Sequence, residues 1–175
     1  EEFLLNPGKP IAVGPYSVSN YAMEARKNQE EALERSKEVI LEVAKKFKDL
    51  SGREYGLFEE YKTEDADYII VAFGSAARVA EKSIEVARQQ GIKVGLFRPI
   101  TLWPFPEKQL HELAQRCKGI LVAEINAGQM IQDVRLAVNG KVPVEHFGRL
   151  GGIVPEPEEI VEAVKQLISN TQSTK

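Results

Sequence analysis

The feature that most constrains this chain is a regular alternation, after Asp65, of short apolar runs with segments of helical periodicity. Four of the apolar runs are predicted to be strands, and they cover residues 68–73, 92–98, 120–123 and 142–147. The first of them is continuous and rich in β-branched residues, which is typical of a strand buried on both faces. Because a helical segment follows each run, the pattern predicts parallel strands joined by right-handed crossovers.

The fold class expected from this pattern is α/β: a three-layer, doubly wound, mostly parallel sheet preceded by a long helical connector. The connector is assigned to residues 1–64 and the sheet domain to residues 65–175. Within the connector, residues 21–50 carry apolar side chains on one helical face, which predicts a long amphipathic helix. Gly52 is expected to end this helix, and the aromatic-rich residues 53–62 are expected to link it to the sheet domain.

The composition excludes several classes of function. A net charge of −3 across 175 residues gives no broad attraction for a phosphate backbone or an anionic membrane surface, so neither nucleic acid nor membrane is an expected partner. No apolar run approaches the roughly 20 residues that a bilayer-spanning helix needs. The chain is therefore expected to be soluble. Its start at Glu1 without a Met is compatible with a fragment, a processed product or an incompletely described chain.

The cysteine content bears on both the compartment and the chemistry. Cys117 is the single cysteine, so the chain can form no internal disulfide, and an intracellular, cytoplasmic location is expected. An all-cysteine iron–sulfur cluster needs about four thiolates, so this chain by itself cannot hold one. The helical spacing around Cys117 predicts a core residue in preference to a reactive thiol.

Ligands of doubly wound sheets bind at the carboxyl ends of the strands, so a site is expected in one of the four strand-to-helix loops. The first loop lacks a GxGxxG or GxxxxGK(S/T) pattern, and no nucleotide phosphate site is predicted there. Ser75 in this loop is interpreted as a helix cap. The fourth loop, residues 147–152, is glycine-rich and contains Arg149. A tight turn is its main interpretation, with phosphate or carboxylate recognition as the alternative.

The second loop, residues 98–106, is stiffened by three prolines. Arg98 opens it, and Trp103 and Phe105 are predicted to lie exposed at the edge of the domain. Two interpretations stay open. The loop either folds over its own domain or packs on another subunit or domain, a role for which stiffened aromatic side chains are well suited.

The third loop places a carboxylate, Glu124, at a strand end and two amides, Asn126 and Gln129, just before a helix. Glu124 is considered as a general base, but no His, Lys or second carboxylate stands next to it in the sequence. Asn126 is interpreted as a helix cap in preference to a catalytic group. His111 and His146 lie far apart and lack the spacing of metal ligands, so no catalytic residue and no metal site is assigned. The residues expected at interfaces are Arg98, Trp103, Phe105, Glu124, Asn126, Gln129 and Arg149.

Five short runs carry a resemblance to a known family. They are Gly-Arg-Glu-Tyr at 52–55, Glu-Asp-Ala-Asp at 64–67, Gly-Ser at 74–75, Arg-Pro-Ile-Thr-Leu-Trp-Pro-Phe-Pro at 98–106 and Glu-Ile-Asn-Ala-Gly-Gln-Met at 124–130. With them, essentially the whole chain resembles the carboxyl-terminal portion of the α chain of 2-oxoacid:ferredoxin oxidoreductases. The last two runs are the specific ones. In this resemblance, residues 65–175 are similar to the carboxyl-terminal domain of transketolase.

The resemblance implies an enzyme that uses thiamine diphosphate with Mg²⁺ to decarboxylate a 2-oxoacid, passes the electrons through iron–sulfur clusters to ferredoxin, and releases an acyl-CoA. In this family those groups belong to other domains or to the β, γ and ferredoxin-like δ subunits, so none is expected on this chain. The substrate-facing loop of the α chain would lie upstream of Glu1, and no catalytic residue is transferred. Of pyruvate, 2-oxoglutarate and 2-oxoisovalerate, the branched-chain acid is favoured as the substrate.

The resulting hypothesis is a domain that helps to hold a multi-subunit oxidoreductase together and is inactive by itself. Two alternatives remain. One is a self-contained doubly wound module that binds a small ligand or transmits a signal, such as a receiver-like or flavin-binding domain. The other is the equivalent domain of another thiamine enzyme, a transketolase or an oxoacid dehydrogenase.

Overall fold

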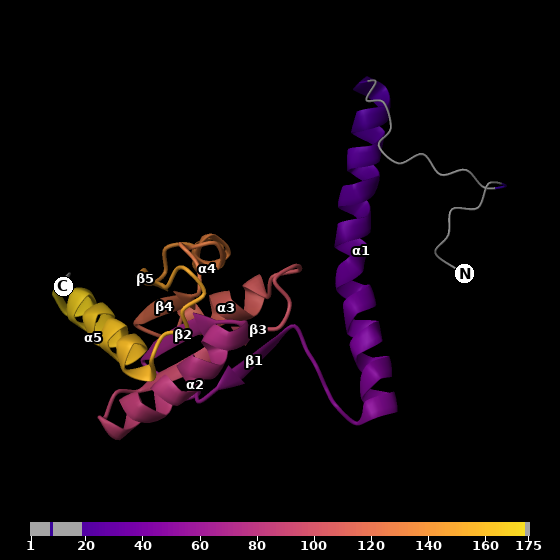
Figure 1. Cartoon of the computed structure of the whole chain (residues 1–175). Helices are drawn as coiled ribbons and strands as arrows, with labels where there is room; N and C mark the ends of the chain where they lie inside the picture. The colour runs from indigo at the N-terminus through magenta and orange to yellow at the C-terminus, as the bar shows by residue number, and fades with distance from the viewer. Residues whose placement is uncertain (1–7, 9–18, 174–175) are drawn as a thin grey trace. The chain divides into compact units, whose positions relative to one another are not determined.

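The computed structural model describes Gly8 and residues 19–173 of the chain (Figure 1). The chain divides into two compact units, Glu1–Ile40 and Leu41–Lys175. Helix α1 (Ser19–Ser51) begins in the first unit and ends in the second, and it confirms the long helix predicted for residues 21–50. Gly52 follows it with a φ of 70°, a left-handed conformation that favours glycine and stops the helix as expected.

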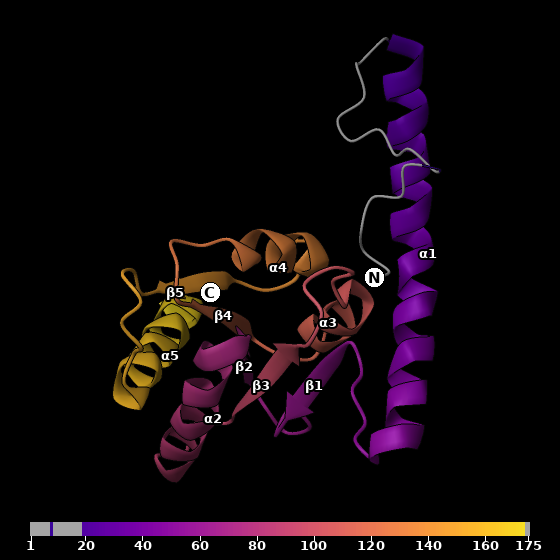
Figure 2. The ribbon, with the colours of Figure 1, turned by 45° about the vertical axis from the view of Figure 1, so that its right-hand side comes forward.

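The second unit is built on one sheet of five strands in the order β1-β3-β2-β4-β5 (Figure 2). The strands are β1 (Phe58–Tyr61), β2 (Tyr68–Ala72), β3 (Val94–Pro99), β4 (Gly119–Glu124) and β5 (Val144–Gly148). Strands β2 to β5 pair in parallel, whereas β1 runs antiparallel to β3 at one edge. The α/β class and the mostly parallel sheet predicted from the alternating pattern are therefore confirmed.

Strand β1 lies inside the segment that was expected only to link the long helix to the sheet domain. Its sequence, Phe-Glu-Glu-Tyr, has no continuous apolar run because most of its side chains are exposed at the sheet edge. Phe58 anchors it by stacking on Phe97 of β3, with the ring centroids 5.2 Å apart. The sheet therefore begins before the predicted boundary between residues 64 and 65.

Four helices cover the two faces of the sheet, as Figures 1 and 2 show. They are α2 (Gly74–Gln89) and α5 (Pro157–Ser173) on one face, and α3 (Glu107–Ala114) and α4 (Met130–Val138) on the other. Successive side chains of a strand point to opposite faces, so Ile69 enters the core beneath α3 and α4 whereas Ile70 enters the core beneath α2 and α5. None of the helices in the described residues is both long and apolar enough to cross a bilayer.

The strand order creates a topological switch point between β2 and β4. The chain leaves β2 to form β3 on one side and then crosses back to form β4 on the other. The loops that follow β2 and β4 therefore lead to helices on opposite faces of the sheet, and they leave a crevice between them.

Arg88, in the last turn of α2, ties the link between β1 and β2 to the rest of the domain. Its Nε donates to the carbonyl oxygen of Val94 at 2.8 Å, and its Nη2 donates to the carbonyl oxygen of Lys62 at 2.8 Å. The same Nη2 is 2.7 Å from Oδ1 of Asp65. One planar guanidinium thus joins α2, β3 and the turn that precedes β2, an arrangement that lysine could not reproduce.

Replacement of Asp65 by Asn should make stability depend less on pH. The hydrogen bond from Arg88 holds the pKa of the Asp65 carboxyl below its ordinary value of 3.8. A depressed pKa in the folded state stabilises the fold above the ordinary value, and this stabilisation is lost as the pH falls through the folded pKa. The urea midpoint of Asp65→Asn should therefore lie below that of the wild type at pH 7, and the two should converge as the pH falls below 3.8 and through the folded pKa. Asp49→Asn, at an exposed site, is the matched control.

Gly95 of β3 is a position where the sheet tolerates no side chain. A Cβ there would lie 2.5 Å from the carbonyl oxygen of Lys62 and 2.9 Å from Cα of Thr63, both of them backbone atoms. Gly95→Ala should therefore lower the free energy of unfolding by about 2–3 kcal/mol in urea titrations. In Gly56→Ala the nearest atom is 3.6 Å away, so a change beyond about 0.5 kcal/mol in this control would contradict the steric argument.

Candidate functional site at the carboxyl ends of the parallel strands

Glu124, the last residue of β4, holds the carboxyl edge of the sheet together. Its side chain is fully buried. One carboxylate oxygen accepts from the backbone N–H groups of Met130 at 2.8 Å and Gln129 at 3.3 Å, and the other accepts from Ile131 at 3.2 Å. These donors begin α4, so the carboxylate also meets the positive end of the helix dipole. The Glu124 carboxylate therefore holds the start of α4 to the end of β4.

Asn126 shapes the turn between β4 and α4. Its Nδ2 donates to Glu124 at 3.2 Å, while its Oδ1 accepts from the N–H groups of Gly128 at 2.7 Å and Gln129 at 3.2 Å. The prediction that Asn126 caps the helix is therefore wrong: Asn126 binds N–H groups of the turn that precedes α4, and Glu124 accepts from the first helical N–H groups. The Gln129 side chain is exposed beside them.

His146 of β5 joins this site, although nothing in the sequence places it next to Glu124. Because β4 and β5 are parallel and His146 pairs with Val122, its ring lies under the loop that follows β4. Its Nε2 is 3.6 Å from a Glu124 oxygen, beyond hydrogen-bonding distance, and has no hydrogen-bond partner within the described part of the chain. A Cβ on Gly148 would collide with the ring, so the glycine makes room for the imidazole.

A crevice of about 220 Å³ lies at the switch point between the loops after β2 and β4. Its walls are backbone and small or apolar groups from residues 73–76, together with Ile125 and Asn126. Helix α2 begins at Gly74, with Phe73 at the capping position, and it receives no hydrogen bond from a capping side chain. The prediction that Ser75 caps this helix is therefore wrong, because Ser75 already lies within the first turn.

The loop after β3 is divided between the core and the surface. Trp103 is 56% exposed and Leu102 is exposed beside it, whereas Phe105 is only 8% exposed and packs in the core with Leu110. The prediction of an exposed Phe105 is thus wrong, because its ring fills the space beneath the start of α3. The Thr101 hydroxyl donates to the carbonyl oxygen of Pro104 at 2.7 Å across a cis Trp103–Pro104 peptide. At the head of the loop, Arg98 pairs with Glu59 of β1 at 3.0 Å.

The loop after β5 is a tight turn, which agrees with its main interpretation. Gly151 and Gly152 both have positive φ, at 75° and 73°. Arg149 donates its backbone N–H to the carbonyl oxygen of Glu124 at 3.1 Å, and its guanidinium pairs with Glu159 in the first turn of α5. The single cation of this loop is therefore used to fasten β4 and α5.

In the described residues, no three His, Cys, Asp or Glu side chains lie close enough to hold a metal ion. Burial raises the pKa of the Cys117 thiol to about 11, so the thiol stays protonated at neutral pH. The carboxyl edge therefore offers a small crevice and exposed apolar side chains, with its buried charges used internally.

Comparison with known proteins identifies the chain's relatives. Residues 66–160 match the family model described as pyruvate:ferredoxin oxidoreductase core domain II. The chain is 41% identical over 110 residues to the ketoisovalerate oxidoreductase subunit VorB of Methanothermobacter marburgensis, covering 63% of this chain and 31% of that protein. It is 31% identical over 170 residues to the pyruvate synthase subunit PorA of Methanothermobacter thermautotrophicus, covering 94% of this chain and 44% of that one. The chain thus spans less than half the length of either relative.

A solved structure shares the fold. The 2-oxoglutarate:ferredoxin oxidoreductase of Magnetococcus marinus, with 2-oxoglutarate, coenzyme A and succinyl-CoA bound, superimposes with a TM-score of 0.60 at 27% identity. The superposition covers 88% of this chain and 24% of that one. The likeness therefore extends over most of this chain but over a minor part of the larger enzyme.

Glu124→Gln should destabilise the domain strongly while leaving its volume unchanged. The amide removes the charge that accepts three backbone donors, and it turns an NH₂ group toward N–H groups that cannot accept. We expect the free energy of unfolding to fall by about 2–4 kcal/mol in urea titrations, since hydrogen bonds to charged groups contribute about 1.5–3 kcal/mol each. Glu112→Gln, at an exposed site on α3, is the control, and equal losses in the two variants would contradict the capping role.

Proposed function

We propose, from the premise that this chain belongs to the pyruvate:ferredoxin oxidoreductase core domain II family, that it is the carboxyl-terminal portion of an α subunit. The whole enzyme would be a thiamine-diphosphate-dependent 2-oxoacid:ferredoxin oxidoreductase, which decarboxylates its substrate to an acyl-CoA and reduces ferredoxin. The domain described here would act in assembly, and the isolated chain would be inactive. Relatives that are subunits of oxidoreductases support the enzymatic setting.

The main support for the assembly role is that Trp103 is exposed at the carboxyl edge of the sheet. Over half of its surface is exposed, although tryptophan is among the most strongly buried residues on average. The loop that holds it is anchored on both sides, by the burial of Phe105 and by the pairing of Arg98 with Glu59. A large aromatic side chain on a restrained loop suits an interface, because little conformational freedom is lost when it binds.

The iron–sulfur clusters and the magnesium ion of such an enzyme do not fit the residues that the structure describes. An iron–sulfur cluster needs about four thiolates, and the sequence contains only Cys117, whose side chain is buried. A magnesium-bound diphosphate needs clustered oxygen ligands, and the described residues contain no group of acidic side chains able to hold a metal. We therefore assign thiamine diphosphate, Mg²⁺ and the clusters to other domains and to the β, γ and δ subunits, in the cytoplasm.

The substrate that we propose is 2-oxoisovalerate. Support comes from the ketoisovalerate oxidoreductase subunit, which is 41% identical to this chain over 110 residues. A pyruvate synthase subunit of Pyrococcus furiosus is 39% identical over 122 residues, so sequence identity separates the two acids only narrowly. Ferredoxin reduction by the assembled complex, measured with 2-oxoisovalerate, pyruvate and 2-oxoglutarate in turn, tests this choice. A higher kcat/KM for either of the other two acids would overturn it without affecting the assembly role.

Trp103→Ser should weaken assembly while leaving the domain folded. When the chain is co-expressed with the other subunits, we expect the variant to retain them at least tenfold less well in affinity purification, because central aromatic residues contribute strongly to interfaces. Leu136→Ser is the matched control, since Leu136 is an exposed apolar residue that belongs to α4 and not to this loop. Circular dichroism should show the same fold in both variants. Unchanged retention in Trp103→Ser would contradict the role of this loop.

A further inference from the structure

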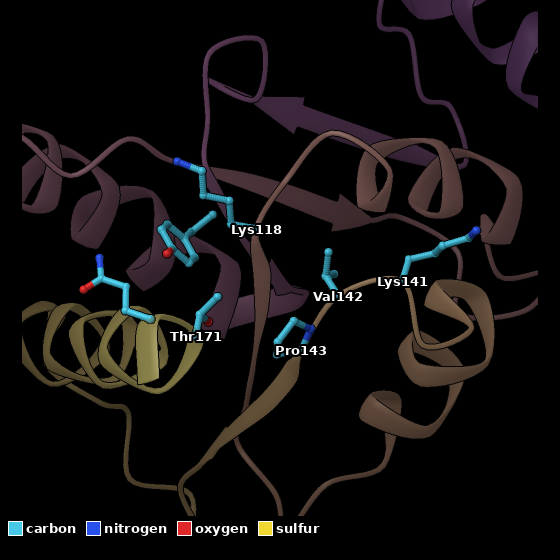
Figure 3. A pocket seen from close by; sticks show the side chains of 7 residues that line it. Lys118, Lys141, Val142, Pro143 and Thr171 are labelled. Atoms are coloured by element: carbon cyan, nitrogen blue, oxygen red, sulfur yellow. The ribbon is translucent and has the colours of Figure 1, made fainter. Parts of the chain in front are cut away.

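A groove of about 420 Å³ lies at the amino edge of the sheet, where β2, β4 and β5 begin, and Figure 3 shows it from close by. Lys118 in this groove is already paired with Asp67 at 2.9 Å, and the ammonium of Lys141 points away from the hollow. Neither lysine therefore offers a free charge to a ligand there. The unpartnered features of the sheet domain lie at the opposite edge, where the parallel strands end.

The exposed apolar side chains of the sheet domain are concentrated at this carboxyl edge. In residues 65–173, six large apolar side chains are exposed, and five of them belong to two loops at the carboxyl edge. Single exposed apolar residues are normal on a protein surface, whereas a cluster of them marks a binding surface. Leu102 and Trp103 lie in the loop after β3, and Leu150, Ile153 and Val154, each more than half exposed, lie in the loop after β5.

Glu159, in the first turn of α5, holds both ends of the loop after β5, residues 149–156. One carboxylate oxygen pairs with the Arg149 guanidinium, and the other accepts the backbone N–H of Glu156 at 2.8 Å. The backbone N–H of Arg149 also donates to the carbonyl oxygen of Glu124 at 3.1 Å. Because the 149–156 loop is fixed at both ends, its exposed side chains lose little conformational freedom when they bind.

The free charges beside these apolar side chains are acidic. Glu156 and Glu158 are exposed, and neither forms an ion pair with any residue that the structure describes. The cation of the loop, Arg149, is already paired with Glu159. A partner complementary to this surface therefore presents apolar groups bordered by Lys or Arg side chains.

A second copy of the chain does not fit this surface. In a two-fold symmetric dimer, the same patch of each copy meets across the contact. Glu156 and Glu158 would then face like charges, and the juxtaposition of like charges across an interface costs free energy. The charge distribution therefore favours a different protein as the partner.

The 149–156 loop is close enough to Trp103 for one partner to cover both. Strands β3 and β5 are three positions apart in the sheet, which corresponds to about 14 Å at about 4.8 Å per strand. A standard interface covers about 800 Å² on each partner, a patch roughly 28 Å across. A subunit that binds around Trp103 is therefore wide enough to reach the 149–156 loop.

We propose that the 149–156 loop forms a second contact with the subunit that binds around Trp103. That subunit presents an apolar surface, which covers Leu150, Ile153 and Val154, and a border of Lys or Arg side chains, which pair with Glu156 and Glu158. The inference rests on the assembly role proposed above, and it identifies the kind of surface that the partner offers.

The test uses the full chain co-expressed with the other subunits, and it measures how well affinity purification retains them. Ile153→Ser should lower retention about fivefold or more, because it removes aliphatic surface from the contact. Glu156→Lys should lower it about threefold or more at about 50 mM NaCl, and less at about 500 mM, because salt screens charges. Leu136→Ser, on α4, and Glu112→Lys, on α3, are the matched controls at exposed sites.

The outcomes separate this inference from the assembly role. Lower retention in Trp103→Ser with unchanged retention in Ile153→Ser would overturn the inference and leave the assembly role intact. Unchanged retention in Trp103→Ser would contradict the assembly role and the inference with it. If Ile153→Ser loses the circular dichroism spectrum of the wild type, Leu150→Ser decides in its place.

Two further outcomes test the kind of partner. A loss of retention in Ile153→Ser without a loss in Glu156→Lys would overturn the cationic border, and with it the proposed partner. Light scattering of the chain alone tests the second copy. A dimer of the chain that Ile153→Ser dissociates would show that another copy covers the loop, and it would overturn the proposal.

Discussion

The contact between the Glu124 carboxylate and the start of α4 is the interaction on which the carboxyl edge of this domain depends. An isolated buried carboxylate is costly, yet here three backbone N–H groups and the Asn126 amide surround it. The same contact fixes the end of β4, the turn that follows and the first turn of α4. The backbone carbonyl of Glu124 also receives the N–H of Arg149, so the loop after β5 is held by the same residue.

Several charged side chains of the domain are used to hold the fold together. Glu124, Arg149 and Arg88 all satisfy backbone groups or other elements of the fold, and none is left exposed in a way that suits catalysis. The features directed outward are instead the apolar side chains of the loop after β3, above all Trp103. These outward-facing side chains are the basis of the assembly role proposed above.

Much of the fold could be predicted because the pattern of apolar residues in the sequence indicates which segments are buried. The continuous runs that became β2 and β4 are apolar on both faces, and the helices that cover them show the expected spacing. Strand β1 was not predicted, because an edge strand with exposed glutamates has no continuous apolar run. Phe105 and Trp103 look alike in the sequence, yet one ring fills the core and the other is exposed. The sequence shows that the loop contains two large aromatic residues, but it does not show which of the two is buried in the core.

The sequence by itself therefore determined the α/β class, the parallel strands, the long helix and the resemblance to a family, because these depend on local periodicity and motifs. Only the tertiary structure decided which residues meet. His146 lies beside Glu124 because β4 and β5 pair in one register, and Tyr68 pairs with Gly119 because β2 and β4 are neighbours. Such contacts join residues distant in the chain, and they are set by strand order, which local patterns do not encode.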